Sequence, residues 1–473
     1  MLFNSLTFIV FFAVVVGSYW CLQSWDSKKN LLLGASYCFY GAWNPPFAAL
    51  LLATTSMDFW LGERIHEANT KGARKVWMWA SVTVNLSMLG FFKYGNFLLE
   101  NLQAVLAGVG VHYMPPHLDI LLPVGISFYT FHSLSYTLDV YRGVIIPTTS
   151  FRDFVLAVSF FPQLVAGPIV RAADFLPQCE EAPKADMRRF YWGLLLVTAG
   201  LFEKVVLADT LLTASADTVF SHKGPLNGLD AWTGVLAFSG QIFFDFAGYS
   251  MCAIGTALCM GFGLKNNFRS PYAARGFSDF WQRWHISLST FLRDFLYIPL
   301  GGNRVGRVRQ AVNLVIVMFI GGLWHGAAWT FVAWGLLHGA YLVMERVLVG
   351  VFGAASWSGS WLAKFVITLL TFGAVSIAWV FFRASNFGDA WNLLQSLAGM
   401  APQGELVLGT RSIVQVLLVV AGMLTIHACL RNISLEDAVA RLPAWLLTGT
   451  WAAMLVAIII TQGNSNAFIY FQF

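Results

Sequence analysis

The chain has 473 residues, of which 57% are hydrophobic and 11% are charged, and its mean hydropathy is +0.65. Soluble domains carry about 25% charged residues, so this composition excludes an ordinary cytosolic enzyme, a coiled coil and a disordered chain. The net charge of +5 is small and dispersed, so no nucleic-acid partner is expected. Long continuous apolar segments predict an all-α polytopic membrane protein rather than a β-barrel.

The candidate membrane spans follow one another along the chain without an intervening soluble segment. The first lacks the basic residues and the cleavage site of a signal peptide, so we expect it to be retained. By a criterion of ~20 apolar residues, the spans are 6–22, 31–44, 46–62, 76–98, 118–137, 152–170, 190–212, 231–263, 311–348, 361–383, 412–430 and 443–461. We therefore expect one membrane-embedded domain over residues 1–473.

Basic residues alternate between the loops and predict the orientation of the chain. Loops 171–189 and 265–309 are rich in arginine and lysine, whereas loop 213–230 holds one such residue, Lys223. By the positive-inside rule, the two basic loops face the cytoplasm. Segment 311–348 is too long for one straight span and too short for two full ones.

A few charged residues lie within the predicted spans. They are Lys93, Asp139, Glu203, Lys204 and Asp245. Asp245 is the most isolated of them along the sequence, and we expect it to pair with a basic residue of a neighbouring segment.

The long basic loop contains a predicted helix. Apolar residues recur at helical spacing through residues 277–295, which predicts an amphipathic helix at the cytoplasmic interface or dipping into the protein. Asp279 and Arg283 lie on its polar face. His285 lies on the apolar face, so we expect it to contact protein or lipid. A lone histidine in such a place is more often a structural residue bonded to a carbonyl than a catalytic one.

A second histidine gives a stronger functional signal. His325 lies near the middle of segment 311–348 among the small residues Gly321, Gly322, Gly326, Ala327 and Ala328. This pattern predicts a break in the helix at membrane depth, which is tolerated only where the backbone lines a cavity or is buried in protein. An ionisable residue there favours function, and helix packing is the alternative. For His338, between Gly335 and Gly339, we favour packing.

Cofactor motifs are missing from the sequence. It holds no P-loop, no G-x-G-x-x-G, no H-E-x-x-H and no C-x-x-C. We therefore predict no metal site and no permanently bound cofactor, and no residue is assigned to cofactor binding. Desolvation favours neutral imidazole at both histidines, and a neutral imidazole is a competent general base.

Two long motifs closely resemble those of the membrane-bound O-acyltransferase family. They are DFWQRWHISLSTFLRDFLYIPLGG at residues 279–302 and GGLWHGAAWTFVAWGLLHG at residues 321–339. The LYIPLGGNR run favours the polysaccharide-modifying members over the teichoic acid members. The resemblance implies a ring of about 11 transmembrane helices with short re-entrant or interfacial helices. It also implies a central tunnel in which a cytoplasmic acyl donor meets an acceptor from the opposite side.

The resemblance also implies roles for individual residues. His325, in the W-H-G motif, and His285, in W-x-R-W-H-x-S-L-S, are expected to be catalytic. His325 would act as a general base or form a transient acyl-imidazole, while His285 would orient the donor or relay a proton. Substrate contacts are expected from four further residues: Trp324, Asp279, Arg283 and Asn303.

The expected function is O-acetylation of an exported polysaccharide such as alginate or cellulose. The donor would be acetyl-CoA or another acyl thioester, docked at the basic 265–309 segment, whose arginines suit its phosphates. Expected partners are a periplasmic acetyltransferase or acetyl-acceptor protein, the polysaccharide export machinery and the bilayer. The expected location is the bacterial cytoplasmic (inner) membrane, crossed several times.

Three alternatives remain open from the sequence. A proton-coupled transporter would use the histidines as a relay and would show inverted repeats. A D-alanyl transfer protein of the teichoic acid type would carry a different acyl group. A structural scaffold of an export complex would keep its function after His325→Ala.

Overall fold

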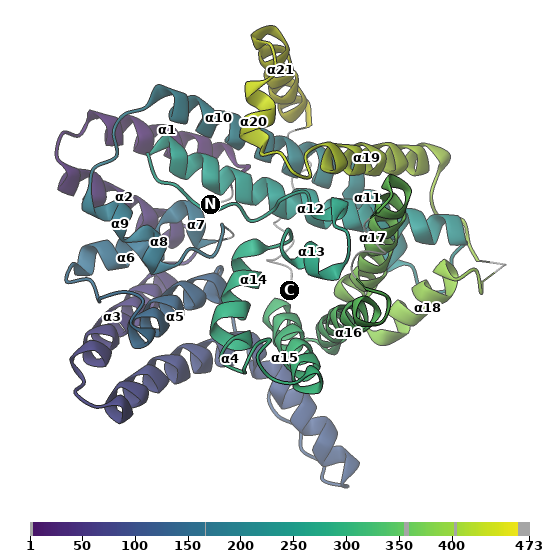
Figure 1. Ribbon diagram of the computed structural model, residues 1–473, viewed down its shortest axis with the longest axis horizontal. Coiled ribbons are helices and arrows are strands. Elements are labelled where there is room, and N and C mark those ends of the chain that lie inside the picture. Colours follow the sequence, from purple (N-terminus) through teal and green to yellow (C-terminus); the bar gives the residue numbers. More distant parts are fainter. Residues whose placement is uncertain (1–2, 166, 354–358, 402–403, 462–473) are drawn as a thin grey trace. The chain divides into compact units, whose positions relative to one another are not determined.

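The computed structural model describes residues 3–165, 167–353, 359–401 and 404–461 (Figure 1). The regular secondary structure of the described residues is helical, apart from an isolated bridge between Leu226 and Glu405. It forms two compact units. Unit 1 is Met1–Val197 with Cys252–Lys265, and unit 2 is Thr198–Met251 with Asn266–Phe473. The expectation of one domain over residues 1–473 therefore stays a prediction.

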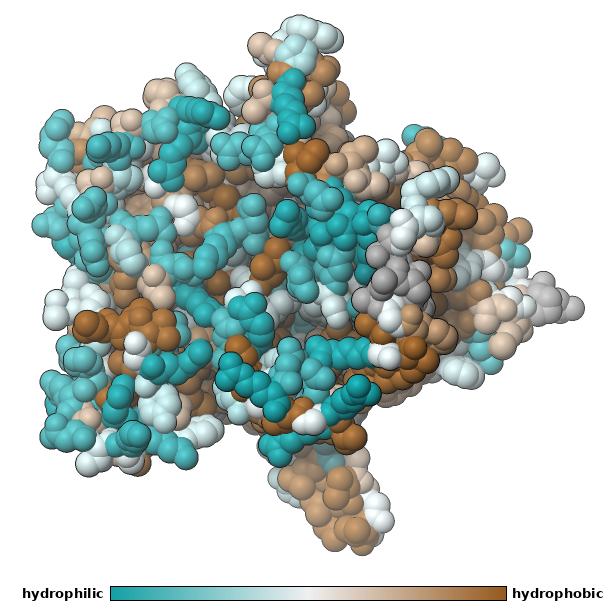
Figure 2. Space-filling model, in the orientation of Figure 1, coloured by the Kyte–Doolittle hydropathy of each residue, from teal (hydrophilic) through white to brown (hydrophobic). Residues whose placement is uncertain are grey.

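Unit 1 is built from helices, the first four of which are joined by three-residue loops. Its main helices are α1 (Leu6–Cys21), α2 (Trp25–Gly41), α3 (Pro45–Glu67), α4 (Lys71–Gly108), α5 (Ile126–Arg142), α6 (Phe151–Ser159) and α10 (Met187–Leu201), with short helices α7 (Phe161–Leu164), α8 (Ala172–Phe175) and α9 (Pro177–Glu180). Helix α4 has 38 residues, and its C-terminal end exposes apolar side chains that are brown in Figure 2. At 1.5 Å per residue it is roughly 57 Å long, longer than a hydrocarbon core is thick.

Two predicted spans of unit 1 are shorter than expected. The span predicted at 118–137 begins only at Ile126, because Pro123 and the left-handed Gly125 (φ 77°) precede it. The span predicted at 152–170 ends as helix α6 at Ser159, and the four-residue α7 follows with a proline in its first turn. Both corrections have the same cause, since proline and glycine interrupt the backbone where hydrophobicity alone continues.

Unit 2 carries the residues of the two long sequence motifs. Its helices are the π-helix η1 (Phe202–Leu212), α11 (Thr213–Ser221), α12 (Gly228–Cys259), the 3-10 turn η2 (Pro271–Ala273), α13 (Phe277–Trp281), α14 (Ile286–Leu292), the π-helix η3 (Arg293–Tyr297), α15 (Arg307–His325), α16 (Trp329–Phe352), α17 (Trp361–Arg383), α18 (Phe387–Leu397), α19 (Thr410–Cys429), α20 (Leu435–Ala440) and α21 (Ala444–Thr461). Helix α12 runs from unit 2 into unit 1 without a break, so the long span predicted at 231–263 is a single helix.

Helices α15 and α16 form a tight hairpin, which accounts for the unusual length of the predicted apolar segment 311–348. The chain breaks at residues 326–328, directly after His325, as the glycines predicted. A Cβ added at Gly322 would lie 2.3 Å from the carbonyl oxygen of Phe331, and one at Gly335 would lie 2.3 Å from that of Met318. The two backbones can approach this closely only because these positions lack side chains, which supports the packing interpretation of the Gly335–Gly339 pair.

A buried ion-pair cluster joins η1 to α12. Lys204 Nζ lies 2.8 Å from Asp209 Oδ1 and 2.5 Å from Asp245 Oδ1, and all three side chains are less than 5% exposed. The expected ion pair of Asp245 with a basic residue of a neighbouring segment is therefore confirmed. An unpaired charge buried in this way would be costly, and the lysine ammonium contacts both carboxylates.

Helix length and composition support a multi-pass membrane protein. In the described residues, six helices are long and apolar enough to cross a bilayer: α12, α15, α16, α17, α19 and α21. Helix α1 is also apolar, but it has only 16 residues. This criterion gives fewer spans than the expected 11, because several predicted spans form helices that are short or carry charged and polar residues.

Candidate active site

The segment that carries His285 is interrupted. Helix α13 ends at Trp281 and α14 begins at Ile286, so the continuous helix predicted over 277–295 is wrong. The interruption has a physical cause in residues 267–269, which bond to the turn. Asn267 O accepts from Ile286 N at 2.9 Å, and Arg269 N donates to Arg283 O at 2.9 Å. These bonds replace those that a continuous helix would make, and periodicity in the segment itself does not reveal them.

His285 occupies a strained backbone position at this turn. Its φ of 43° and ψ of 55° lie in the left-handed region, which among the described non-glycine residues only Ser270 shares. A residue with a Cβ adopts this region at an energetic cost, and such strain is concentrated at functional sites. The side chain is fully buried. The expectation that it faces protein or lipid is thus met, while its catalytic role stays a prediction.

Asn267 fixes the protonation pattern of the His285 ring. Asn267 Oδ1 contacts Ser287 N at 3.2 Å, Ser287 Oγ at 2.9 Å and His285 Nδ1 at 3.3 Å. The Ser287 amide can only donate, so the Asn267 atom at this point is the oxygen. His285 Nδ1 must then carry the hydrogen, and Nε2 must carry the lone pair. Sequence reasoning missed Asn267, because an amide next to a basic loop gives no signal of its own.

The Nε2 atom of His285 carries the lone pair of the ring. It is buried and has no hydrogen-bond partner among the residues that the structure describes. In the sequence, His285 falls between two candidate membrane-spanning helices, α12 and α15. Burial of its ring lowers the pKa of the imidazole from 6.5 to about 3. The imidazole is therefore neutral at pH 7, and a negative charge beside it would raise this pKa.

His325 and His285 lie side by side in unit 2. Their ring centroids are 6.3 Å apart, and His325 is 3% exposed at the last position of α15. Trp324 contacts both, with its ring centroid 5.7 Å from His285 and 5.0 Å from His325. The structure thus brings together three of the six predicted site residues.

An aromatic cluster surrounds the two histidines. The ring of His325 packs against Trp334 and Phe382 at 5.0 and 5.2 Å, and that of His285 packs against Phe246 at 4.7 Å. Trp334 is fully buried and stacks on Trp379 at 5.6 Å. Such packing excludes water and holds the rings in place, which strengthens any electrostatic interaction inside the site.

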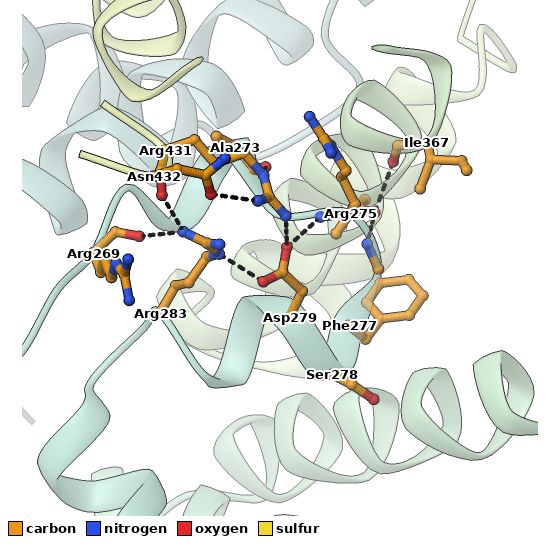
Figure 3. Close-up of polar contacts among 12 residues, drawn as sticks. Arg269, Ala273, Arg275, Phe277, Ser278, Asp279, Arg283, Ile367, Arg431 and Asn432 are labelled. Atoms are coloured by element: carbon orange, nitrogen blue, oxygen red, sulfur yellow. Dashed lines mark hydrogen bonds and ion pairs between the residues drawn. The ribbon is translucent and has the colours of Figure 1, made fainter. Parts of the chain in front are cut away.

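Asp279 and Arg283 belong to a polar network beside the turn (Figure 3). Asp279 Oδ1 accepts from Arg283 Nε at 2.6 Å, and its Oδ2 accepts from Arg431 Nη2 at 2.5 Å and from Arg275 N at 2.8 Å. Arg283 Nη1 also donates to the carbonyl oxygens of Arg269 and Arg431. All these contacts are with the chain itself, so the network holds α13 and the turn in place. A direct contact of Asp279 or Arg283 with substrate stays a prediction.

Glu345 is a further residue that the sequence did not reveal. Its Oε2 accepts from the amides of Phe277 and Ser278 at 2.6 and 2.8 Å, at the start of α13. Glu345 lies on α16, so this carboxylate ties the turn with His285 to the hairpin with His325. A carboxylate also suits the positive end of a helix.

Asn303 lies away from the two histidines. It is exposed, and its Oδ1 accepts from Tyr297 Oη and Gln310 Nε2, both at 2.6 Å. Gln310 is in the first turn of α15 and His325 is at the last position, which separates them by roughly 22 Å. The structure therefore does not bring Asn303 to the histidines. The described residues contain no group of three or more histidine, cysteine or acidic side chains that could hold a metal ion.

Comparisons with known proteins find similarity to membrane-bound acyltransferases. Residues 144–356 match the model of the family described as membrane-bound O-acyltransferase. The chain is 42% identical over 400 residues to a probable alginate O-acetylase of Pseudomonas aeruginosa, covering 84% of this chain and 75% of that protein. It is 37% identical over 432 residues to a peptidoglycan O-acetyltransferase of Helicobacter pylori, covering 85% and 80%. A teichoic acid D-alanyltransferase of Streptococcus thermophilus is 31% identical over 234 residues, covering 47% of this chain and 56% of that protein.

Proposed function

Since this chain belongs to the membrane-bound O-acyltransferase family, we propose that it passes an acetyl group across the membrane for O-acetylation of an exported polysaccharide. The observation that carries the proposal is the buried His285–His325 pair, at a centroid distance of 6.3 Å. The O-acetylase relatives named above support acetyl as the group transferred. Their match extends over more of the chain than that of the D-alanyltransferase.

The chemistry needs a proton acceptor next to the attacking hydroxyl. In the proposed reaction, a hydroxyl oxygen attacks the thioester carbonyl, its proton moves to His325, and the C–S bond breaks to release a thiolate that takes up a proton. A transient acyl-imidazole on His325 is the covalent form of the same transfer. His285, whose ring lies beside that of His325, then serves as the relay for the proton.

The two substrates would approach from opposite sides. We propose that acetyl-CoA or another acyl thioester docks at the basic 265–309 segment on the cytoplasmic side of the inner membrane. Arg269 and Arg275 are exposed there and suit the phosphates of such a donor. A tunnel within a ring of transmembrane helices would lead the acetyl group outward. A periplasmic acetyltransferase or acetyl-acceptor protein, working with the export machinery, would receive it and pass it to alginate, cellulose or another glycan.

The test is the acetyl-ester content of the secreted polysaccharide. We expect His325→Ala, at equal membrane abundance, to abolish the esters. His427→Ala is a matched control, because His427 is also buried in an aromatic setting, 4.6 Å from Phe243, but has no proposed chemical role. Unchanged esters in His325→Ala would overturn the proposal that His325 acts in this modification. Thioester hydrolysis by the purified protein then shows whether the chemistry or the choice of acceptor was wrong.

A further inference from the structure

An apolar groove runs along the outer face of the α15–α16 hairpin. It has a volume of about 480 Å³. Its lining comes from Val312, Val315 and Ile316 of α15 and from Ala340, Val343 and Met344 of α16. Val312 and Met344 are about half exposed, so the groove opens to the surroundings of the hairpin. In a membrane-spanning hairpin such a surface faces lipid, and its shape and polarity suit an acyl chain.

Four arginines gather at one end of this groove. Arg309 precedes Val312 by three positions and Ile316 by seven, which puts it on the groove face of α15, and Arg307 precedes the lining residue Ala311 by four. Arg346 follows Val343 by three positions on α16. Arg304, the fourth, lies in the loop directly before α15.

Hydrogen bonds show that these arginines share the same end of the hairpin. Arg346 Nη1 donates to Asn303 Oδ1 at 3.4 Å, and Gln310 Nε2 donates to the same atom at 2.6 Å. Asn303 therefore joins the C-terminal half of α16 to the first turn of α15, and Arg304 is its neighbour. We call Arg304, Arg307, Arg309 and Arg346 the arginine collar.

The collar carries positive charge without acidic partners. In the described part of the chain, none of its four arginines lies within ion-pair distance of a carboxylate. The nearest acid in sequence, Glu345, is bound to the amides of Phe277 and Ser278 instead. Four such guanidinium groups therefore attract an anion, and the planar guanidinium can bind a phosphate group through two hydrogen bonds.

We propose that this groove and collar form a binding site for one anionic phospholipid. The acyl chain lies between α15 and α16, and the headgroup phosphate contacts the arginine collar. The basic 265–309 segment places the collar on the cytoplasmic side, where a phospholipid phosphate lies at the level of the helix ends. An apolar groove that ends in a cluster of cations is complementary to both parts of such a lipid. The groove itself has no part in the proposed acetyl transfer, although Arg304, Arg307 and Arg309 of the collar belong to the basic 265–309 segment proposed to dock the donor.

The site has a structural consequence for the hairpin. A lipid that touches both α15 and α16 stabilises their contact, and α15 ends at His325. We therefore expect the lipid to raise the thermal stability of the protein, since a ligand that binds only the folded state stabilises it.

The experiment uses the full-length purified protein in detergent. Native mass spectrometry follows the binding of phosphatidylglycerol and of phosphatidylcholine, added separately. We expect phosphatidylglycerol to remain bound under conditions that release phosphatidylcholine. The double variant Arg307→Gln/Arg309→Gln should weaken phosphatidylglycerol binding roughly 30-fold, since each basic residue near a lipid surface contributes about a factor of 5 to 6.

Two matched controls separate the site from general effects. Arg411→Gln/Arg441→Gln removes the same charge from exposed positions elsewhere, and it should bind phosphatidylglycerol as the wild type does. Ala340→Trp fills the groove and should abolish retention, whereas Leu336→Trp places the same indole ring at an exposed position of α16 outside the groove lining and should retain the lipid. The double arginine variant keeps the test valid if Ala340→Trp does not fold.

Three results would overturn the proposal. Equal retention of the two lipids by the wild type would show a surface for bulk lipid only. Loss of lipid from both arginine pairs alike would show that net charge, not the collar, is responsible. Displacement of bound phosphatidylglycerol by coenzyme A would assign the collar to the phosphates of the donor. His325→Ala should leave lipid binding unchanged. A failure of the proposed acetyl transfer can therefore be distinguished from a failure of the lipid proposal.

Discussion

The imidazole rings of His285 and His325 lie with their centroids 6.3 Å apart, although α14, η3 and most of α15 separate the two residues in sequence. The fold achieves this through two interruptions, one at the left-handed His285 and one directly after His325. Each histidine is therefore held at the end of a helix, where the backbone changes direction. Both rings thereby lie in one buried aromatic cluster, in which Trp324 contacts each of them.

The first prediction concerns Asn267 as a positioning residue. Asn267→Leu removes the acceptor that holds His285 Nδ1–H, so the ring can rotate or change its tautomer. We expect turnover of an acyl thioester to fall by roughly 100-fold, the size of one proton-transfer contribution. Asn267→Asp keeps the acceptor oxygen and should retain more activity. Its negative charge raises the pKa of His285, so the pH profile of turnover should gain a limb that the wild type lacks.

The His285→Ala background provides the control for this prediction. If Asn267 acts through His285, Asn267→Leu has no further effect once the imidazole is gone. Independent losses that multiply in the double variant would show that Asn267 only supports the fold.

Several helices could be predicted from the sequence to within a residue or two. Helix α17 coincides with the predicted span 361–383, and α21 begins one residue after the predicted start of 443–461. These segments are uniformly apolar, so hydrophobicity alone defines them. The resemblance to known motifs located His325 and His285, while the glycines around His325 independently predicted the break.

Other features could not be predicted because they depend on distant partners. The turn at His285 is fixed by backbone bonds from Asn267 and Arg269, and the start of α13 is capped by Glu345 from α16. From the sequence alone, a ligand-binding Asp279 or Arg283 cannot be told from one that pairs with another residue of the chain. Only their placement shows the carboxylate in contact with Arg283, Arg431 and the amide of Arg275.

The second prediction tests the close approach of α15 and α16. A Cβ at Gly335 would lie 2.3 Å from the carbonyl oxygen of Met318, and a backbone atom cannot move away as a side chain can. We expect Gly335→Ala to destabilise the protein by about 1–3 kcal/mol, as overpacking does. Gly373→Ala on α17 meets no atom within 4 Å and should be neutral or stabilising. Thermal unfolding in detergent compares the two, and equal stability would contradict the tight contact.

The third prediction concerns the charge cluster of Lys204. Lys204→Met removes the cation that contacts the buried Asp209 and Asp245, and removal of one partner from a buried pair costs about 3–5 kcal/mol. We expect strongly reduced abundance in the membrane. Replacement of both aspartates by asparagine in the same chain should restore much of the loss. A Lys204→Met protein of normal abundance and melting temperature would show that the carboxylates are protonated or hydrated instead.

The fourth prediction follows from the burial of His285, which lowers its pKa from 6.5 to about 3. Between these two values the unfolded chain binds a proton at this residue and the folded protein does not. The neutral His285 therefore does not reduce the free energy of unfolding above pH 6.5. As the pH falls from 6.5 toward 3, it lowers the free energy of unfolding by at most about 1.4 kcal/mol per pH unit. His285→Gln removes this contribution, so its melting temperature should fall less steeply than that of the wild type between pH 6.5 and 4. Parallel curves for the two proteins would mean that the His285 site admits water, and with it a charged imidazolium.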